Sequence, residues 1–254
     1  MTPELLAYDD VGSGLPVVLI HGLTFSRHSW EPMATRLAEQ HRVLTVDLPG
    51  HGDSLGSAAV PTDVAARLVA TLRAANVEEP LVVGHSVGAI HATAVAALTR
   101  VSGVVNVDQP LLIAPFSGFL QQMAPALRGP DFAAAFAPFE ESIGVHNLPD
   151  PERRRLQSTR TIRQELVLDH WSMPMAASPE RAQSELDEML GKVDAPYLYL
   201  AGDDVPAPVE QHLRAHLPHL EVVVWGGTGH LPQHSDPEAF VRLVSDFVAR
   251  STSG

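Results

Sequence analysis

The 254-residue sequence contains no cysteine, and Lys192 is the sole lysine among its seventeen basic residues. Without cysteine, the protein can form no disulfide bond, no thiolate metal site and no cysteine nucleophile. Schiff-base chemistry could occur only at Lys192. The fold must therefore be stabilised by packing alone.

The sequence also lacks long hydrophobic runs and an excess of positive charge. No apolar run approaches the roughly 18 residues that suggest a membrane span, and residues 1–10 lack the features of a signal peptide. The net charge of -13 disfavours binding to nucleic acid or to an anionic membrane, because phosphate binding needs clustered Lys and Arg. We expect a cytoplasmic protein, monomeric or homodimeric, whose partner is a small-molecule substrate.

Short β-branched runs alternate with helix-length stretches over much of the chain. The expected strands are Val17–Ile20, Val43–Val46, Leu81–Val83, Val104–Val107, Tyr197–Leu200 and Val222–Trp225. The expected helices between them are Trp30–Gln40, Thr62–Ala75, Val87–Thr99, Val209–Leu217 and Pro237–Arg250. Continuous apolar strands are typical of a parallel sheet that helices cover on both faces. We predict an α/β fold with a mostly parallel, doubly wound sheet.

The alternation stops between residues 111 and 192, where strand signals are missing. The helical stretches there are Phe116–Leu127, Phe132–Ser142, Pro151–Trp171 and Pro179–Leu190. A structureless loop of this length would be unusual in a compact domain. We predict an all-helical cap over 111–192, inserted after the fifth or sixth strand of a core formed by 1–110 and 193–254. The run Arg153–Arg155 in this cap is expected to be a solvated helix face.

One serine lies between two glycines at the end of an expected strand, in the sequence Gly84-His85-Ser86-Val87-Gly88. This pattern is typical of a nucleophile elbow, a sharp strand-to-helix turn that exposes the serine hydroxyl. The close approach of strand and helix would leave no room for a Cβ two residues from the serine. The helix that follows would point its free N–H groups at a forming oxyanion. The alternative is a glycine-lined turn with an incidental serine.

Four segments in this order, residues 18–23, 46–54, 84–88 and 227–231, resemble the successive landmarks of the α/β-hydrolase family. Among its members, the chain is similar to esterases and lactonases that carry a helical cap. The resemblance implies that the backbone N–H groups of Leu23 and Val87 form an oxyanion hole, and that no cofactor or metal is needed. We expect Asp47, in the second segment, to hold its loop through side-chain to backbone hydrogen bonds.

A serine hydroxyl needs a base with a pKa near the working pH, and histidine is the natural choice. Among thirteen histidines, His230 stands apart because it follows the last expected strand in a Gly-rich loop, where the family has its catalytic histidine. His212 and His216 have a spacing that could bind a metal, but no glutamate lies between them, and a surface helix is the expected role.

The acid that orients the histidine has two candidate positions. The family mostly carries it in a Gly-x-x-Asp pattern after the cap, where this sequence has Val205. Some members use a carboxylate at the end of the strand after the nucleophile helix, and Asp108 has that place. We favour Asp108, with Asp204 or Asp203 as the alternative if the loop is shifted by one residue.

Serine rather than aspartate at position 86 disfavours dehalogenase and epoxide hydrolase chemistry, which needs a carboxylate nucleophile. We predict a serine hydrolase that cleaves a small, mostly apolar carboxylic ester or lactone through Ser86, His230 and Asp108. The alternatives are a cofactor-free oxygenase, perhydrolase or carbon–carbon bond hydrolase, and a ligand-binding sensor. The apolar cap residues expected near the pocket are Phe116, Phe119, Met123, Phe132, Phe136, Phe139, Trp171, Met173 and Met175. Trp171 is the one we assign to a pocket wall.

Overall fold

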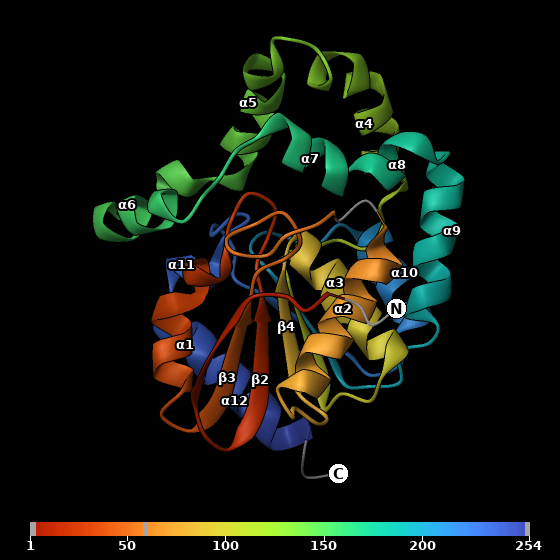
Figure 1. The fold of residues 1–254 in the computed structure, drawn as a ribbon. Coiled ribbons are helices and arrows are strands. Elements are labelled where there is room, and N and C mark those ends of the chain that lie inside the picture. The colour runs from red at the N-terminus through yellow and green to blue at the C-terminus, as the bar shows by residue number, and fades with distance from the viewer. Residues whose placement is uncertain (1–3, 58–59, 252–254) are drawn as a thin grey trace.

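A computed structural model describes residues 4–57 and 60–251, and its centre is a seven-stranded sheet (Figure 1). The strands run in the order β1-β3-β2-β4-β5-β6-β7. Their bounds are β1 Tyr8–Gly12, β2 Leu15–Ile20, β3 His41–Val46, β4 Leu81–His85, β5 Gly103–Val107, β6 Tyr197–Ala201 and β7 Leu220–Val224. All neighbours pair in parallel except β1 and β3. The predicted α/β class with a mostly parallel sheet is confirmed.

Strand β1 was not expected from the sequence. It is an antiparallel edge strand, and four of its five residues, Asp9 to Gly12, are exposed. An edge strand in this position buries too little apolar surface to leave a continuous hydrophobic run in the sequence. The pattern that predicts buried strands therefore missed it.

Helices cover both faces of the sheet, as expected for a doubly wound fold. The core helices are α1 Glu31–Leu37, α2 Pro61–Ala74, α3 Val87–Leu98, α10 Ala207–His216, α11 Pro232–Ser235 and α12 Pro237–Ser251, with a 3₁₀ turn at Arg27–Trp30. Along β4, Leu81 and Val83 belong to a buried cluster that includes residues of α1 and α12, whereas Val82 belongs to a second cluster that includes residues of α2, α3 and α10. Strands β4, β5 and β6 are buried along their whole length, because both of their faces are covered.

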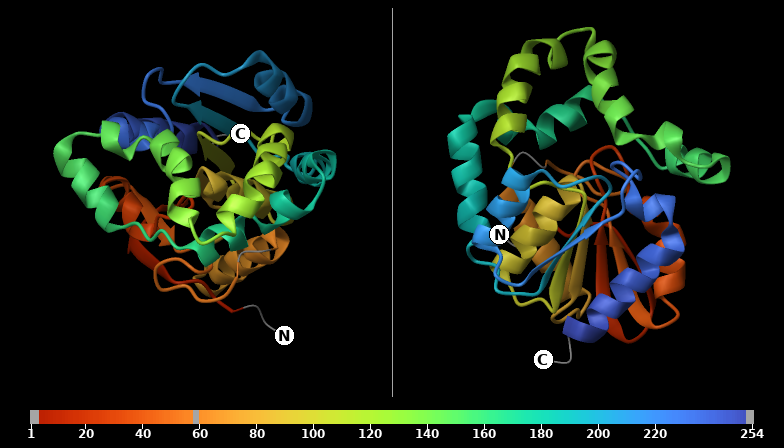
Figure 2. Two further views of the ribbon diagram at one scale, coloured as in Figure 1. Left: turned by 90° about the horizontal axis from the view of Figure 1, so that it is seen from above. Right: turned by 180° about the vertical axis from the view of Figure 1, so that it is seen from behind.

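The segment between β5 and β6 is helical. It contains α4 Ala114–Leu127, α5 Phe132–Ile143, α6 Asp150–Ser158, α7 Gln164–His170, α8 Ser172–Ala176, α9 Pro179–Leu190 and a 3₁₀ turn at Val145–Asn147. Most of it lies over the carboxyl ends of the strands (Figures 1 and 2). The division into a core and a cap at residues 110/111 and 192/193 stays a prediction. Residues 1–3, 58–59 and 252–254 of that core lie outside the described residues.

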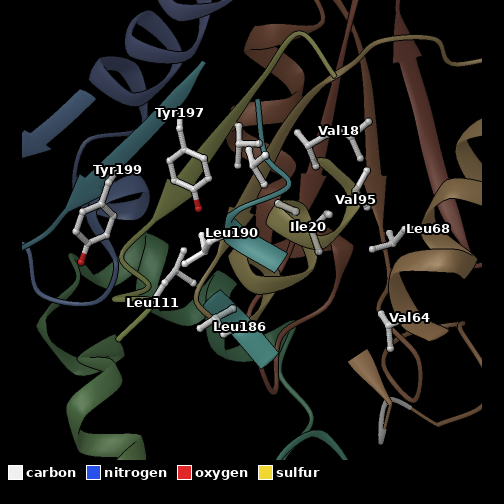
Figure 3. Close-up of a cluster of buried hydrophobic side chains, with 14 of the residues drawn as sticks. Val18, Ile20, Val64, Leu68, Val95, Leu111, Leu186, Leu190, Tyr197 and Tyr199 are labelled. Carbon is white, nitrogen blue, oxygen red and sulfur yellow. The ribbon is translucent and has the colours of Figure 1, made fainter. Parts of the chain in front are cut away.

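Helix α9 belongs to this segment but packs along the core. Its residues Leu186 and Leu190 share one buried cluster with Tyr197 of β6 and Leu111 (Figure 3). The segment is therefore joined to the sheet through hydrophobic packing as well as through its two chain connections. Among the described residues, the structure has no helix with the length and apolar character that crossing a bilayer requires.

The single helix expected over Pro151–Trp171 was wrong. Helix α6 ends at Ser158, and the chain runs without regular structure until α7 begins at Gln164. In this break, the amide of Thr161 donates to the Thr24 carbonyl oxygen of the core at 2.8 Å. β-Branched residues in the break disfavour a helix, and a hydrogen bond to the core replaces the helical one.

The expectation that Arg153–Arg155 forms only a solvated face was also wrong. Arg154 is exposed and pairs with Asp150. Arg155 is partly buried and donates to the carbonyl oxygens of His28 and Ser29 at 2.9 and 3.0 Å. One residue of the run thus fastens α6 to the core.

Candidate active site

Ser86 lies at the tight turn between β4 and α3, with φ 53° and ψ -128°. A non-glycine residue in this region of φ/ψ space is strained, and such strain persists only where the surrounding structure enforces it. The Ser86 amide donates to the Val107 carbonyl oxygen of β5 at 3.0 Å, and its carbonyl oxygen accepts from the Ala89 amide at 2.8 Å. Both bonds hold the turn at the end of the sheet.

The two glycines that flank Ser86 have no room for a side chain. A Cβ on Gly84 would lie 2.2 Å from the Gly88 carbonyl oxygen, and a Cβ on Gly88 would lie 2.5 Å from the carbonyl oxygens of Ile20 and His21. Real Cβ atoms do not approach backbone oxygens so closely. The glycines are therefore a steric condition for this turn.

Asp108 and His230 form a hydrogen-bonded pair beside the serine turn. The two residues are 122 positions apart in the sequence, and Asp108 Oδ2 accepts from His230 Nδ1 at 2.7 Å. The other carboxylate oxygen, Oδ1, accepts from the Gly202 amide at 2.9 Å. Asp108 has φ 54° and directly follows β5, which neighbours the serine strand β4. Because parallel strands end at the same edge, Ser86 and Asp108 face one crevice.

Asp203 and Asp204, the alternative candidates for the acid, lie in more exposed surroundings than Asp108. Asp203 and Asp204 are exposed, and Asp203 Oδ1 accepts from the Gly227 amide at 3.1 Å, bracing the loop that carries His230. A Cβ on Gly202 would lie 1.7 Å from the Gly229 carbonyl oxygen, so these two loops are in direct contact. Among the three carboxylates considered, the structure brings Asp108 into contact with the imidazole.

His85, which precedes the serine, was not singled out in the sequence. Its Nε2 lies 2.8 Å from the His230 carbonyl oxygen, and the two rings are 4.9 Å apart. Burial lowers the pKa of His85 well below its ordinary value, so at neutral pH the ring is uncharged and Nε2–H can donate to that carbonyl. His85 thus fixes the backbone of the loop that carries His230. Its place in the Gly-x-Ser motif was a signal that could have identified it.

Leu23 and Val87 both line the cavity at Ser86. Within residues 4–57 and 60–251, neither backbone N–H donates a hydrogen bond to the protein, which leaves both amides available to a ligand. Their elements are adjacent, because β2, which precedes Leu23, pairs with β4. A Cβ on Gly22 would lie 3.2 Å from the Ser86 Cβ, which shows how closely the two loops approach.

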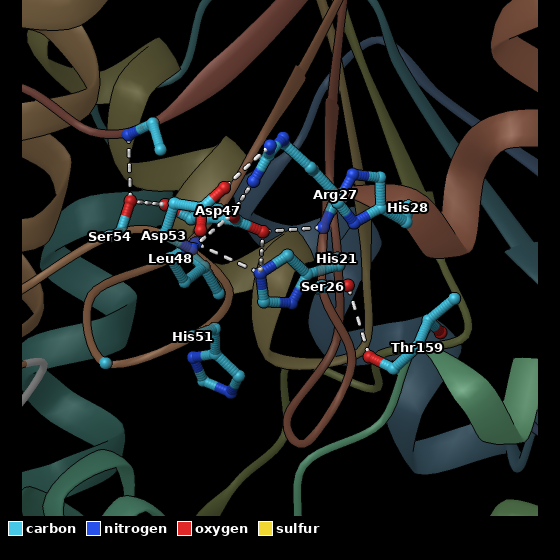
Figure 4. A network of polar contacts seen from close by, with 12 residues as sticks. His21, Ser26, Arg27, His28, Asp47, Leu48, His51, Asp53, Ser54 and Thr159 are labelled. Atoms are coloured by element: carbon cyan, nitrogen blue, oxygen red, sulfur yellow. Dashed lines mark hydrogen bonds and ion pairs between the residues drawn. The ribbon is translucent and has the colours of Figure 1, made fainter.

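A buried polar network holds the loop that follows β2 (Figure 4). Asp47 is fully buried, and its Oδ1 accepts from the Arg27 amide at 2.7 Å, while its Oδ2 accepts from the Asp53 amide at 3.0 Å. The Arg27 guanidinium also pairs with Asp47. His21 Nε2 accepts from the Leu48 amide at 3.0 Å. Asp47 therefore holds two loops by side-chain to backbone hydrogen bonds, and with them the position of Leu23.

The cavity at Ser86 has a volume of about 1000 Å³ and walls that are mostly apolar. Five of the nine apolar cap residues expected near a pocket line it: Phe116, Phe136, Phe139, Trp171 and Met173. The Trp171 ring lies 4.8 Å from the Phe139 ring and 5.7 Å from the Phe116 ring. Trp171 is thus one part of an aromatic wall, and no sequence feature ranks it above its neighbours.

A histidine that lines this cavity has no hydrogen-bond partner within the described part of the chain. His91 lies on α3, one and a half turns after Ser86, and is 2% exposed. Among the described residues, neither ring nitrogen has a hydrogen-bond partner. Burial lowers the pKa of His91 to about 3, so the ring is neutral at pH 7. The sequence did not single out this histidine, because it lies inside an apolar helix.

Comparisons with known proteins agree with this geometry. A model described as the alpha/beta hydrolase family matches residues 17–243. The chain belongs to the alpha/beta hydrolase family. This hydrolase is 30% identical to the pimeloyl-[acyl-carrier protein] methyl ester esterase of Yersinia enterocolitica, over 93% of this chain and 94% of that protein. It is likewise 30% identical to the esterase of that name from Neisseria meningitidis serogroup B, over 91% of this chain and 92% of that one.

Solved structures show the same fold. This hydrolase superimposes on a hydrolase from Pseudomonas aeruginosa with a TM-score of 0.78 and 20% identity, over 96% of this chain and 94% of that chain. An esterase from Exiguobacterium antarcticum matches with a TM-score of 0.72 and 18% identity, over 96% and 95%. The family resemblance stated from the sequence is confirmed, and the protein is an enzyme, a hydrolase of the serine esterase type.

Proposed function

We propose that this enzyme cleaves a carboxylic ester through Ser86 as nucleophile, His230 as base and Asp108 as the acid that orients the base. The observation that carries the proposal is the 2.7 Å hydrogen bond between Asp108 and His230, beside a serine that is held in a strained turn. Because His230 Nδ1–H donates to Asp108, its Nε2 is left without a proton and can act as a base.

In the first half of the reaction, His230 Nε2 takes the Ser86 proton while the serine oxygen attacks the ester carbonyl carbon. The carbonyl oxygen becomes an oxyanion, which accepts hydrogen bonds from the Leu23 and Val87 amides. Removing one such donor typically costs about 3–4 kcal/mol of transition-state stabilisation. Collapse of the intermediate breaks the ester bond, and His230 returns the proton to the departing alcohol.

In the second half, water replaces the alcohol. His230 takes a proton from the water, the hydroxide attacks the acyl-enzyme carbonyl, and Ser86 leaves with the proton from His230. The acid product then departs. The Asp108 carboxylate accepts the Nδ1–H hydrogen bond and stabilises the imidazolium that forms in each half.

The cavity supports an apolar acyl chain of moderate length rather than a very small ester. A volume of about 1000 Å³ is at the upper end of the range for small-molecule sites. Trp171, Phe116 and Leu112 offer apolar walls. The relatives from Yersinia and Neisseria are named for methyl esters of a carrier-bound acyl group, and a small alcohol such as methanol is our choice of leaving group here.

His91 adds a polar requirement to this substrate. His91 lines a cavity that is otherwise mostly apolar, its two ring nitrogens are buried without a hydrogen-bond partner among the described residues, and a buried polar group without a partner is costly. Because the ring is neutral at pH 7, it suits a neutral hydroxyl, ester or amide group of the substrate better than a carboxylate. We therefore propose an acyl chain with one such group beyond its reacting carbonyl.

The test is turnover of methyl esters of graded chain length by matched variants. Ser86→Ala should abolish hydrolysis, and Asp108→Asn should lower kcat by roughly 10³–10⁴-fold, because the imidazole loses its tautomer control. Asp204→Asn is the control and should keep wild-type kcat. Loss of activity in Asp204→Asn with an active Asp108→Asn would refute the assignment of the acid. Hydrolysis that persists in Ser86→Ala would refute the proposed nucleophile.

A further inference from the structure

Two helices that are distant from Ser86 in the sequence bring three metal-ligating side chains together. Asp187 lies on α9, while His212 and His216 lie on α10. One potential ligand atom from each residue lies within 4.8 Å of the other two. The helices α9 and α10 lie side by side in both side views of the ribbon (Figures 1 and 2). We propose that this cluster binds a divalent transition-metal ion such as Zn²⁺.

The spacing of the donor atoms suits zinc. Zn²⁺ binds nitrogen and carboxylate oxygen at about 2.0–2.2 Å, so tetrahedral ligands are about 3.3 Å apart. His212 Nε2 and Asp187 Oδ1 are 3.2 Å apart already. The histidines are one helical turn apart, and their ring centroids are separated by 4.6 Å. Small side-chain rotations would bring His216 to the third position, with water in the fourth.

The tautomer of His216 is also that of a metal ligand. Its Nδ1–H donates to the His212 carbonyl oxygen at 2.9 Å, which leaves the lone pair of Nε2 free to coordinate. Zinc-bound histidines commonly donate their second N–H to a backbone carbonyl in this way, which orients the ring. All three side chains are partly exposed, so an ion can reach them from solvent.

Without metal, the side-chain amide of Gln183 lies within hydrogen-bonding distance of two members of the cluster, Asp187 and His212. Its side-chain Nε2 donates to Asp187 Oδ1 at 2.7 Å and lies 3.2 Å from His212 Nε2. An ion bound to the same two atoms would lie on the side away from this amide, because an ion at about 2.0–2.2 Å from both atoms on the near side would clash with Gln183 Nε2. The Gln183 Oε1 would keep its hydrogen bonds from the amides of Ile113 and Ala114, where the helical segment begins.

The position of the site gives metal binding a structural consequence. Asp187 belongs to the helical segment between β5 and β6, whereas both histidines belong to α10, the helix that follows β6. Helix α9 also contributes Leu186 and Met189 to the wall of the Ser86 cavity. A bound ion would therefore tie the segment to the core beside the substrate cavity, and it would stabilise the folded state by binding it selectively.

The primary test is calorimetric titration of Zn²⁺ into untagged protein treated with a chelator. Wild type should bind one ion, and His216→Ala should weaken binding about tenfold or more. His219→Ala, an exposed histidine just after α10, is the matched control and should bind as wild type. Mg²⁺ should show no competition, because it prefers oxygen ligands. Equal Zn²⁺ affinity in wild type and His216→Ala would overturn the proposal.

A second variant separates this cluster from the Asp108–His230 pair. His230→Ala should retain one Zn²⁺ with wild-type affinity, and loss of binding in that variant would instead place the ion at the active site and overturn the proposal. Zn²⁺ should also slow amide hydrogen exchange in residues 179–190 and 207–216 of wild type but not of His216→Ala. No esterase activity is needed for these readouts, so the result is independent of the proposed function.

Discussion

At the scale of single residues, the geometry of the candidate active site depends on a few unusual backbone positions. Ser86 and Asp108 both have positive φ, at 53° and 54°, and both follow buried strands. Two neighbouring parallel strands thus end in strained residues, and both of these residues line the cavity that His230 also lines. Strain of about 1–3 kcal/mol at each such residue must be offset by the packing of the rest of the sheet.

We expect His91 to favour substrates that carry the polar group proposed above. His91→Leu should lower kcat/KM for an ω-hydroxy methyl ester about tenfold relative to the plain alkyl ester of equal length, since one hydrogen bond is lost. His91→Gln keeps a neutral donor and acceptor, and it should retain part of the preference. Competition assays with both esters give the ratio directly. An unchanged ratio of the two kcat/KM values in His91→Leu would show that His91 does not contact the polar group of the substrate.

At the scale of elements, helix α6 is fastened to the core by charge-assisted hydrogen bonds. Glu152 Oε1 accepts from His234 Nδ1 of α11 at 2.8 Å and from Arg155 at 2.7 Å. Arg155 in turn donates to the carbonyl oxygens of His28 and Ser29. Burial would raise the pKa of Glu152, but the hydrogen bonds from Arg155 and His234 outweigh it and lower the pKa to about 2.

Glu152→Gln should therefore destabilise the protein by about 1–3 kcal/mol at pH 7, measured by urea unfolding, because Arg155 and His234 lose their charged acceptor. Glu165→Gln is the control, since Glu165 is exposed on α7 and should matter little. The ionised form of Glu152 stabilises the fold above the ordinary glutamate pKa of about 4.5. The difference between wild type and Glu152→Gln should thus shrink as the pH falls from 4.5 towards 2, and a pH-independent difference would contradict this account.

At the scale of the whole molecule, buried neutral histidines couple stability to pH. Burial lowers the pKa of His170 to about 4 and that of His91 to about 3, and it also lowers the pKa values of His51 and His85. Below the ordinary histidine pKa of 6.5, the unfolded chain binds protons that the folded chain does not. The free energy of unfolding should therefore fall as the pH falls from 6.5 to 5.

The size of this effect can be checked with one variant. Each such proton contributes up to about 1.4 kcal/mol per pH unit, so wild type should lose several kcal/mol between pH 6.5 and 5. His91→Leu removes one titrating ring and should reduce the slope by about one proton. Urea unfolding at several pH values measures both slopes. A wild-type free energy of unfolding that is constant over this range would be incompatible with neutral buried histidines.

Much of the fold could be read from the sequence because its signals are local. Six strands and most helices follow from apolar runs and helical periodicity, and the confirmed family landmarks lie at their ends. Two features could not be predicted from the sequence. Edge strand β1 forms by pairing with β3, and the break between α6 and α7 is held by a hydrogen bond to Thr24. Propensity alone does not contain such contacts.

The candidate site divides in the same way. The tight turn at Ser86 follows from local sequence alone, since Gly84 and Gly88 can be explained by sterics within a few residues. The three-dimensional packing of the chain was needed to show that His230 contacts Asp108 rather than Asp204, that His91 lines a cavity, and that Asp187 lies beside His212 and His216. The residues in these contacts are 25 to 122 positions apart, from Asp187 and His212 to Asp108 and His230. The parallel order of the strands and the packing of α9 on the core bring them together.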